Sequence, residues 1–365
     1  MTSESGVASY INADIRAMSG MRPFKVDPSL HRLQWNESPF DFPADLKEEV
    51  LQRLAKIPWS RYPVGFRAFD LIDTVARTVG LESSQVIVGN GSSDILRIAI
   101  QAALRPGDSL VTIAPTFGAY HHQAQIQGAR VVEVPLDPEN DFALPVETIL
   151  DKAAETNARL IVLCTPNNPT GTVYPLEQIR QVVHQSNTLV IVDEAYAEFA
   201  DQDFFPLLNE ADNVILVHTL SKAYALAGVR VGYACTPAPI AVELQKLVNT
   251  FTLSPFSEIA ATVALENKER FRPQIEAVVA ERARLAQELA AIPGIKVHSS
   301  GTNFLLVNIG SPADAAHAAL LANQRVLVTN MTMYRGYDHY LRISVGTAEE
   351  NDLVIAGLRD HLTTR

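Results

Sequence analysis

Residues 159–193 of the chain read RLIVLCTPNNPTGTVYPLEQIRQVVHQSNTLVIVD, in which two short apolar runs are separated by an amphipathic segment. The runs at 159–164 and 188–192 are apolar after their first residues, which predicts strands that are buried on both faces. Runs of this kind alternate with amphipathic stretches from about residue 45 to residue 255. This alternation predicts an α/β fold in which helices cover both faces of a mostly parallel sheet.

Seven runs are predicted to be strands of this sheet, at 86–88, 109–114, 130–134, 159–164, 188–192, 214–217 and 229–234. After Pro255 the pattern changes to a long helical stretch at 257–292, which Pro273 breaks. It is followed by strand-like runs at 304–309 and 340–345 around a helical segment at 313–323. The predicted organisation is an N-terminal arm with the start of the small domain in 1–44, a large domain in 45–255 and a smaller α+β domain in 256–365.

The charge balance restricts the partners of the protein. Thirty Lys and Arg residues against 41 Asp and Glu residues give the 365-residue chain a net charge of −11. Such a surface repels nucleic acid and anionic lipid, so we expect neither as a partner. Cys164 and Cys235 lie in apolar runs, which predicts buried thiols and neither a disulfide nor a metal site. No signal-peptide pattern or membrane-length apolar run is visible, so we expect a cytoplasmic protein.

The residues that follow the strands carry the chemistry, because ligands of an open α/β sheet bind outside the carboxyl ends of its strands. After the first run comes Gly89-Asn90-Gly91-Ser92-Ser93, a glycine turn that leads into a helix. Backbone N–H groups at such a helix start favour a phosphate, although this motif alone is more typical of an ordinary capped helix.

Two further strand ends add a carboxylate, Asp193, and a lysine, Lys222, with Arg230 eight residues beyond the lysine. The chain has no P-loop, and Asp94 stands where a dinucleotide site needs its third glycine, so a kinase-like enzyme and a nicotinamide dehydrogenase are both disfavoured. An anion cradle, a buried carboxylate and a lysine at one sheet edge are what pyridoxal phosphate requires. Phe117 is a candidate to lie flat on the cofactor ring.

Three segments make a family resemblance visible: CTPNNPTG at 164–171, VDEAY at 192–196 and TLSKAYALAGVRVG at 219–232. Together they strongly resemble the fold-type I, class II aminotransferases, and the likeness is closest to the histidinol-phosphate aminotransferases, from Trp35 to Thr347. The resemblance implies a pyridoxal-phosphate enzyme that transfers the amino group of histidinol phosphate to 2-oxoglutarate, in histidine biosynthesis.

The resemblance also implies residue roles. Lys222 would form the Schiff base and Asp193 would pair with the ring nitrogen. The ring oxygen would contact Asn168 and Tyr196, and the phosphate would be held by Ser92, Ser93, Thr219, Ser221 and Arg230. Arg342 would grip the α-carboxylate, with Asn36, Phe24 and Arg335 as further substrate-binding residues. Tyr62 would reach the cofactor phosphate of a partner subunit, which implies a homodimer with shared active sites.

Two positions depart from the family pattern. Thr329, at the start of the predicted small-domain loop, stands where the family carries an arginine or lysine that binds the substrate phosphate, and Phe24 stands where it carries a tyrosine. Loss of a charged phosphate contact favours an aromatic or other unphosphorylated amino acid as the alternative substrate, unless Arg335 substitutes. Decarboxylation of a phosphorylated amino acid on the same cofactor is a further alternative.

Overall fold

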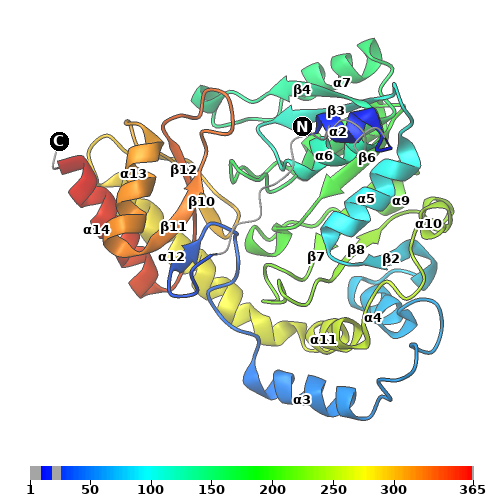
Figure 1. Cartoon of the computed structure of the whole chain (residues 1–365). Coiled ribbons are helices and arrows are strands. Elements are labelled where there is room, and N and C mark those ends of the chain that lie inside the picture. Colours follow the sequence, from blue (N-terminus) through cyan, green and yellow to red (C-terminus); the bar gives the residue numbers. More distant parts are fainter. Residues whose placement is uncertain (1–9, 19–25, 364–365) are drawn as a thin grey trace, which may run out of the picture.

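The structure is a computed structural model that describes residues 10–18 and 26–363 (Figure 1). Its larger sheet has seven strands in the order β2 (Val86–Gly89), β8 (Gly232–Cys235), β7 (Val214–Thr219), β6 (Leu189–Asp193), β5 (Leu160–Cys164), β3 (Ser109–Ala114) and β4 (Arg130–Pro135). All neighbours are parallel except β8, which is antiparallel to β2 and β7. The predicted seven-stranded, mostly parallel sheet is confirmed.

Helices cover both faces of this sheet because its strands are apolar on both sides. On one face β3, β5 and β6 pack against α5 (Ser92–Ala103), α6 (Ala119–Ile126) and α10 (Ala238–Gln245). The other face packs against α4 (Phe69–Val79), α7 (Val146–Glu155), α8 (Leu176–Gln185) and α11 (Pro255–Glu266). Further elements complete this part, namely α2 (Ala13–Ala17), α3 (Ala44–Ala55), α9 (Leu207–Glu210), and the 3₁₀ turns Ser83–Gln85, Pro138–Asn140 and Ala197–Phe199.

The second sheet has five strands in the order β1 (His31–Leu33), β11 (Val326–Asn330), β12 (Tyr340–Ser344), β10 (Phe304–Asn308) and β9 (Lys296–Val297). Its apolar face packs on α12 (Arg272–Ala290), α13 (Ala313–Ala319) and α14 (Ala348–Thr363). Strand β1 pairs in parallel with β11, which brings the N-terminal segment into the C-terminal sheet, and Figure 1 shows the blue strand β1 beside the orange strands.

The stretch at 257–292 breaks near Pro273, as expected, and forms α11, a 3₁₀ turn at Lys268–Phe271 and α12. Pro273 lies in the first turn of α12, where no backbone donor is needed. Two other predicted boundaries were wrong. The run at 229–234 starts as a strand only at Gly232, since Arg230 has a φ of 60°. The helix predicted at 313–323 ends at Ala319 and continues as a π-helical turn at Leu320–Gln324. Strands β1, β9 and β11 were not predicted.

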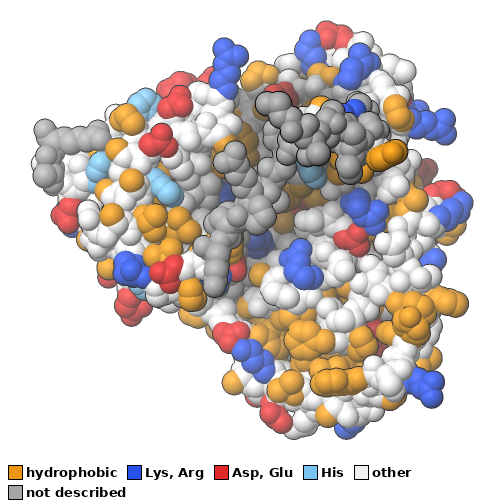
Figure 2. All heavy atoms as spheres, in the orientation of Figure 1, with side chains coloured by type: hydrophobic (Ala, Val, Ile, Leu, Met, Phe, Trp, Pro, Cys, Tyr) orange, Lys and Arg blue, Asp and Glu red, His pale blue; other side chains and the backbone are white. Residues whose placement is uncertain are grey.

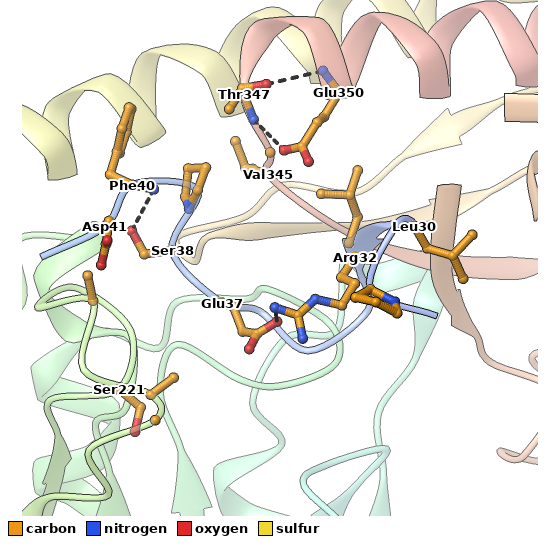
Figure 3. A pocket seen from close by; sticks show the side chains of 17 residues that line it. Leu30, Arg32, Glu37, Ser38, Phe40, Asp41, Ser221, Val345, Thr347 and Glu350 are labelled. Carbon is orange, nitrogen blue, oxygen red and sulfur yellow. Dashed lines mark hydrogen bonds and ion pairs between the residues drawn. The ribbon is translucent and has the colours of Figure 1, made fainter. Parts of the chain in front are cut away.

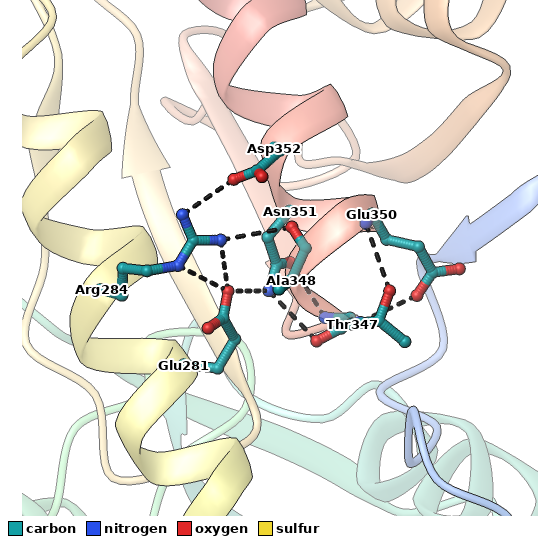
Figure 4. Close-up of polar contacts among 8 residues, drawn as sticks. Glu281, Arg284, Thr347, Ala348, Glu350, Asn351 and Asp352 are labelled. Carbon is teal, nitrogen blue, oxygen red and sulfur yellow. Dashed lines mark hydrogen bonds and ion pairs between the residues drawn. The ribbon is translucent and has the colours of Figure 1, made fainter.

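A polar network fixes the turn that follows β12 (Figure 4). The buried side chain of Asn351 accepts a hydrogen bond from the backbone N of Gly346 at 3.0 Å and donates one to Glu281 Oε1 at 3.1 Å. Arg284 contacts Glu281 as well and donates to Asp352 at 2.8 Å. The network joins α12 to the start of α14, and so anchors the strand that carries Arg342.

Cys164 and Cys235 are free and buried, as predicted. Within residues 10–18 and 26–363, no helix combines the length and the apolar character that crossing a bilayer requires.

Candidate active site

The candidate site forms where the carboxyl ends of three parallel strands meet. Strand β5 ends at Cys164, β6 at Asp193 and β7 at Thr219, and the register pairs Cys164 with Asp193. Because the side chains of a strand alternate, Asp193 points to the face covered by α5 and α6, opposite to Val192. Lys222 follows β7 by three residues, so the predicted carboxylate and lysine lie at one sheet edge.

Asp193 is buried, and its two carboxylate oxygens accept one hydrogen bond each. The hydroxyl of Tyr120 on α6 donates to Oδ2 at 2.7 Å and the backbone N of Ala195 donates to Oδ1 at 3.2 Å. Burial raises the pKa of Asp193 to about 6, although both hydrogen bonds act to lower the pKa. The carboxylate therefore lacks full electrostatic compensation, and a cationic partner above it would remove this cost.

Lys222 is half-buried, and its Nζ donates a hydrogen bond of 2.9 Å to the backbone oxygen of Trp35. The same nitrogen lies 6.0 Å from the ring centroid of Tyr196. Burial first, and then the positive charges of Arg342 and Arg230, lower the pKa of Lys222 to about 8, against the opposing effect of Glu37. About a tenth of this amine would then be neutral at pH 7, and the neutral form is the one that acts as a nucleophile or base.

An anion cup lies beside the lysine, at the N-terminus of α5. Gly91 caps this helix with a φ of 82°, and a Cβ atom there would clash with the guanidinium of Arg230. A Cβ atom on Gly232 would clash with the backbone N of Ser92. The two glycines thus let Arg230 and the free N–H groups of the helix start approach one point.

Hydroxyl groups complete the cup. The Oγ1 atom of Thr219 donates to the Oγ atom of Ser221 at 3.0 Å, and Nη1 of Arg230 lies 3.4 Å from the same Ser221 atom. Ser92 is the first residue of α5, and Ser93 beside it is exposed. The five residues predicted to hold a phosphate therefore belong to one cluster.

Arg342 reaches this edge from β12 of the second sheet. Its Nη1 donates to Oδ1 of Asn168 at 2.6 Å, and its Nη2 donates to the backbone oxygen of Gln34 at 2.7 Å. The Nε atom of Arg342 is buried and has no hydrogen-bond partner in the described part of the chain. Arg342 therefore keeps a donor for a further group, such as a carboxylate.

The hydroxyl of Tyr196 accepts a hydrogen bond from Nδ2 of Asn36 at 2.9 Å, so its own proton is free to be donated. The backbone N of Asn36 donates to Oγ of Ser344 at 2.9 Å, and the same Oγ donates to Oδ1 of Asn36 at 3.0 Å. Asn36 is thus engaged in holding Tyr196. Phe117 is half-buried and meets Tyr120 edge to face at 5.7 Å.

Other predicted residues lie away from this cluster or outside the described chain. Tyr62 is 77% exposed and stacks on Phe251 at 4.5 Å. Arg335 is exposed, and Phe24 lies outside the described residues.

Thr329 is the fourth residue of β11, so its predicted place in a loop was wrong. Its Oγ1 donates to the backbone oxygen of Gln34 at 2.8 Å and accepts from Arg342 at 3.1 Å.

Sequence reasoning missed the contributions of Tyr120, Trp35 and Gln34. The proximity of Tyr120 to the PTFG turn at 115–118 is a sequence signal that could have suggested the first. Trp35 and Gln34 act through backbone oxygens, which any residue type carries, so no side-chain pattern marks them.

A cavity of about 520 Å³ adjoins the site, between the segment at 37–41, the loop at 221–228 and the start of α14 (Figure 3). Glu37, Asp41, Ser221 and Glu350 line it, and Lys222 and Asp193 do not. This cavity therefore shares Ser221 with the anion cup but does not include the lysine or the buried carboxylate.

Comparisons with known proteins agree with this geometry. The family model of class I and II aminotransferases matches residues 29–358. A histidinol-phosphate aminotransferase of Chlorobaculum tepidum is 35% identical over 329 residues, which cover 90% of this chain and 93% of that protein. A histidinol-phosphate aminotransferase of Thermococcus kodakarensis is 35% identical over 345 residues, which cover 94% of this chain and 96% of that protein. The crystal structure of a Sinorhizobium meliloti histidinol-phosphate aminotransferase in complex with pyridoxal-5'-phosphate superposes with a TM-score of 0.87 at 26% identity, covering 98% of each chain.

Proposed function

The chain belongs to the class I and II aminotransferases, and we propose that it is a pyridoxal-phosphate enzyme that transfers the amino group of histidinol phosphate to 2-oxoglutarate, in histidine biosynthesis. The observation that carries the proposal is the meeting of Asp193, Lys222 and the anion cup at one sheet edge. The proposed substrate follows from the similarity to histidinol-phosphate aminotransferases.

The residues of the site fit pyridoxal phosphate. A protonated ring nitrogen would give the buried carboxylate of Asp193 its missing cationic partner. The cup at the start of α5, which the two glycines keep open, suits the phosphate. The ring oxygen would accept from the free proton of Tyr196 and from the amide of Asn168, and Phe117 would cover a ring face. When bound, the cofactor supplies an electron sink for the Cα of the amino substrate.

Lys222 is the residue that moves the proton in this proposal. As a neutral amine, its Nζ would take the proton from Cα of the amino substrate. It would then return a proton to the cofactor carbon that is bonded to the amino nitrogen. The backbone oxygen of Trp35 holds Nζ by a hydrogen bond, and the ring of Tyr196 lies 6.0 Å from it. Arg342 would hold the anionic group of the substrate through Nε, while Asn168 and Gln34 orient the guanidinium.

An unphosphorylated amino acid, in particular an aromatic one, is the second candidate substrate. Thr329 is uncharged, and its hydroxyl is already bonded to Gln34 and Arg342. A phosphate dianion near Arg342 would have only one guanidinium to balance its two negative charges. A carboxylate carries one negative charge, which one guanidinium balances.

We also propose a homodimer in which Tyr62 reaches the cofactor phosphate of the partner subunit. Trp59, Tyr62 and Phe66 are between 67% and 82% exposed, which is unusual for side chains of this size. Figure 2 shows hydrophobic side chains gathered on the face where α4 and α11 lie in Figure 1. A second copy covering this face would bury them.

A half-reaction tests the proposal. Cofactor-loaded protein is mixed separately with L-histidinol phosphate, L-phenylalanine and other amino acids, and loss of the visible band of the lysine-bound cofactor is followed. Rapid loss with histidinol phosphate supports the first substrate, and a preference for an unphosphorylated amino acid supports the second. Product analysis separates transamination from decarboxylation, and absence of any reaction would contradict the proposed function.

A further inference from the structure

Gln34, Thr329 and Arg342 form a row across the second sheet. Thr329 is paired with Arg342 in the register of β11 and β12, and Gln34 directly follows Leu33, which is paired with Val328. Leu33 and Val328 belong to the apolar core against α12, α13 and α14. Since side chains alternate along a strand, the three residues of the row lie on the opposite face, where Arg342 meets Asn168.

The side chain of Gln34 is enclosed but unsatisfied. Only 6% of the residue is exposed, and within the described residues neither its Oε1 nor its Nε2 atom has a hydrogen-bond partner. A buried amide with no partner opposes folding, and a leucine of similar size would avoid this cost. Its placement beside a substrate-binding arginine indicates that the amide serves a ligand.

The chemistry of the amide restricts that ligand. The backbone oxygen of Gln34 is occupied by Arg342 and Thr329, so only the side chain remains to bind a new group. An amide offers two donors and an acceptor, and its complement is a neutral group that both donates and accepts, such as an imidazole, a primary amide or a hydroxyl. A carboxylate or phosphate dianion could accept from Nε2 but has no proton to donate to Oε1, which would stay without a partner.

We propose that Gln34 is a specificity-determining residue, whose side-chain amide hydrogen-bonds a neutral donor-and-acceptor group on the side chain of the amino substrate. The inference rests on the proposed aminotransferase function. It holds for histidinol phosphate, through the imidazole, and for an unphosphorylated amino acid with a neutral polar side chain.

The test compares amino donors that match in shape but differ in hydrogen bonding. The pairs are L-histidine with β-(2-thienyl)-L-alanine, L-glutamine with L-methionine, and L-tyrosine with L-phenylalanine. Second-order rate constants for loss of the visible cofactor band are measured with the wild-type holoenzyme and with Gln34→Leu. The wild type should prefer the polar member of at least one pair by about tenfold or more, and Gln34→Leu should abolish that preference.

Gln274→Leu is the matched control. Gln274 is a half-buried glutamine of α12 whose Oε1 atom is also buried without a partner in the described chain, and it lies outside the site. This variant should keep the wild-type preference. The melting temperature of Gln34→Leu should equal or exceed that of the wild type, because an unsatisfied amide is replaced by an apolar group.

Three results would overturn the inference. The first is a preference that survives in Gln34→Leu, and the second is a wild type that prefers the polar member of no pair. The third is a melting temperature that falls together with an equal loss of rate for all donors, which would make Gln34 a structural residue. If no amino donor bleaches the wild-type band, the proposed function itself fails, and this inference fails with it.

Discussion

The hydroxyl of Tyr120 donates a hydrogen bond of 2.7 Å to Oδ2 of the buried Asp193. Tyr120 lies on α6 and Asp193 at the end of β6, so this bond joins a covering helix to the sheet edge that carries the proposed site. It acts to lower the pKa of a carboxyl whose burial raises it. Tyr120 therefore helps Asp193 to stay ionised, which the proposed contact with a protonated ring nitrogen requires.

The first prediction concerns the stability of the cofactor-free protein. Burial raises the pKa of Asp193 from 3.8 to about 6, so the folded protein holds a proton that the unfolded chain releases in this window. This residue's contribution to the free energy of unfolding should fall as the pH rises through the window, by about 3 kcal/mol in total. Denaturation of wild type and Asp193→Asn between pH 4 and pH 7 measures it as the difference between the two proteins.

Tyr120→Phe should shift the same transition to higher pH, because it removes a hydrogen bond that lowers the pKa of Asp193. A stability difference between wild type and Asp193→Asn that does not change with pH would show that Asp193 is not perturbed by burial. The holoenzyme of Asp193→Asn should lose turnover by at least about a thousandfold, since an amide cannot keep the ring nitrogen protonated.

The extent to which the sequence predicts this site depends on how local the contacts are. Asp193, Lys222 and the turn at Gly91 follow strands of one parallel sheet, and such strands share one carboxyl edge, so their meeting was predictable. Tyr120 contacts Asp193 from 73 residues away, through the packing of a helix across the sheet. Hydrophobic periodicity does not encode such a contact, and only the proximity of Tyr120 to the turn at 115–118 hints at it.

The place of the N-terminal segment in the fold was harder to predict from the sequence. Strand β1 has only three residues, too few to show an alternating pattern, and it pairs with β11 almost 300 residues later. That pairing places Gln34 beside Thr329 and Arg342, and it explains why sequence reasoning found the arginine and the threonine but not the glutamine. The predicted domain limits at 44 and 255 remain predictions.

The second prediction concerns the amine of Lys222. Burial and then the charge of Arg342 lower its pKa to about 8, so the rate of cofactor attachment should rise with pH and level off above this value. Arg342→Gln should move the midpoint upward, whereas Arg342→Lys retains a charge and should move it less. Stopped-flow growth of the visible band across pH 6–10 measures the midpoints of the wild type, Arg342→Gln and Arg342→Lys. Lys222→Ala, which should give no band, is the control. Identical midpoints in all three proteins would exclude Arg342 as a cause.

The third prediction concerns the missing cation at position 329. Thr329→Lys should raise kcat/KM for histidinol phosphate about ten- to hundredfold, as a charged hydrogen bond of about 1.5–3 kcal/mol would. Activity with unphosphorylated amino acids should not rise. Thr329→Val, which removes the hydroxyl bonded to Gln34 but adds no charge, separates the two effects. If Thr329→Lys leaves the use of histidinol phosphate unchanged, position 329 does not face the phosphate.

The last prediction concerns the proposed sharing of active sites between two subunits. Tyr62 is exposed in the single chain, and we expect its hydroxyl to bind the partner's cofactor phosphate. Tyr62→Phe should then weaken cofactor binding about tenfold while leaving the chain folded, because one hydrogen bond to a charged group is lost. Equilibrium dialysis against pyridoxal phosphate measures this affinity.

Hybrid dimers decide from which subunit Tyr62 acts. A subunit carrying Lys222→Ala is inactive but keeps Tyr62, and a subunit carrying Tyr62→Phe keeps the lysine. If Tyr62 acts across the interface, mixing and reassociating the two variants creates one site with both native residues, and high-affinity cofactor binding and turnover return at that site. If Tyr62 acts within its own subunit, no hybrid site contains both residues, and the mixture remains as weak as Tyr62→Phe alone.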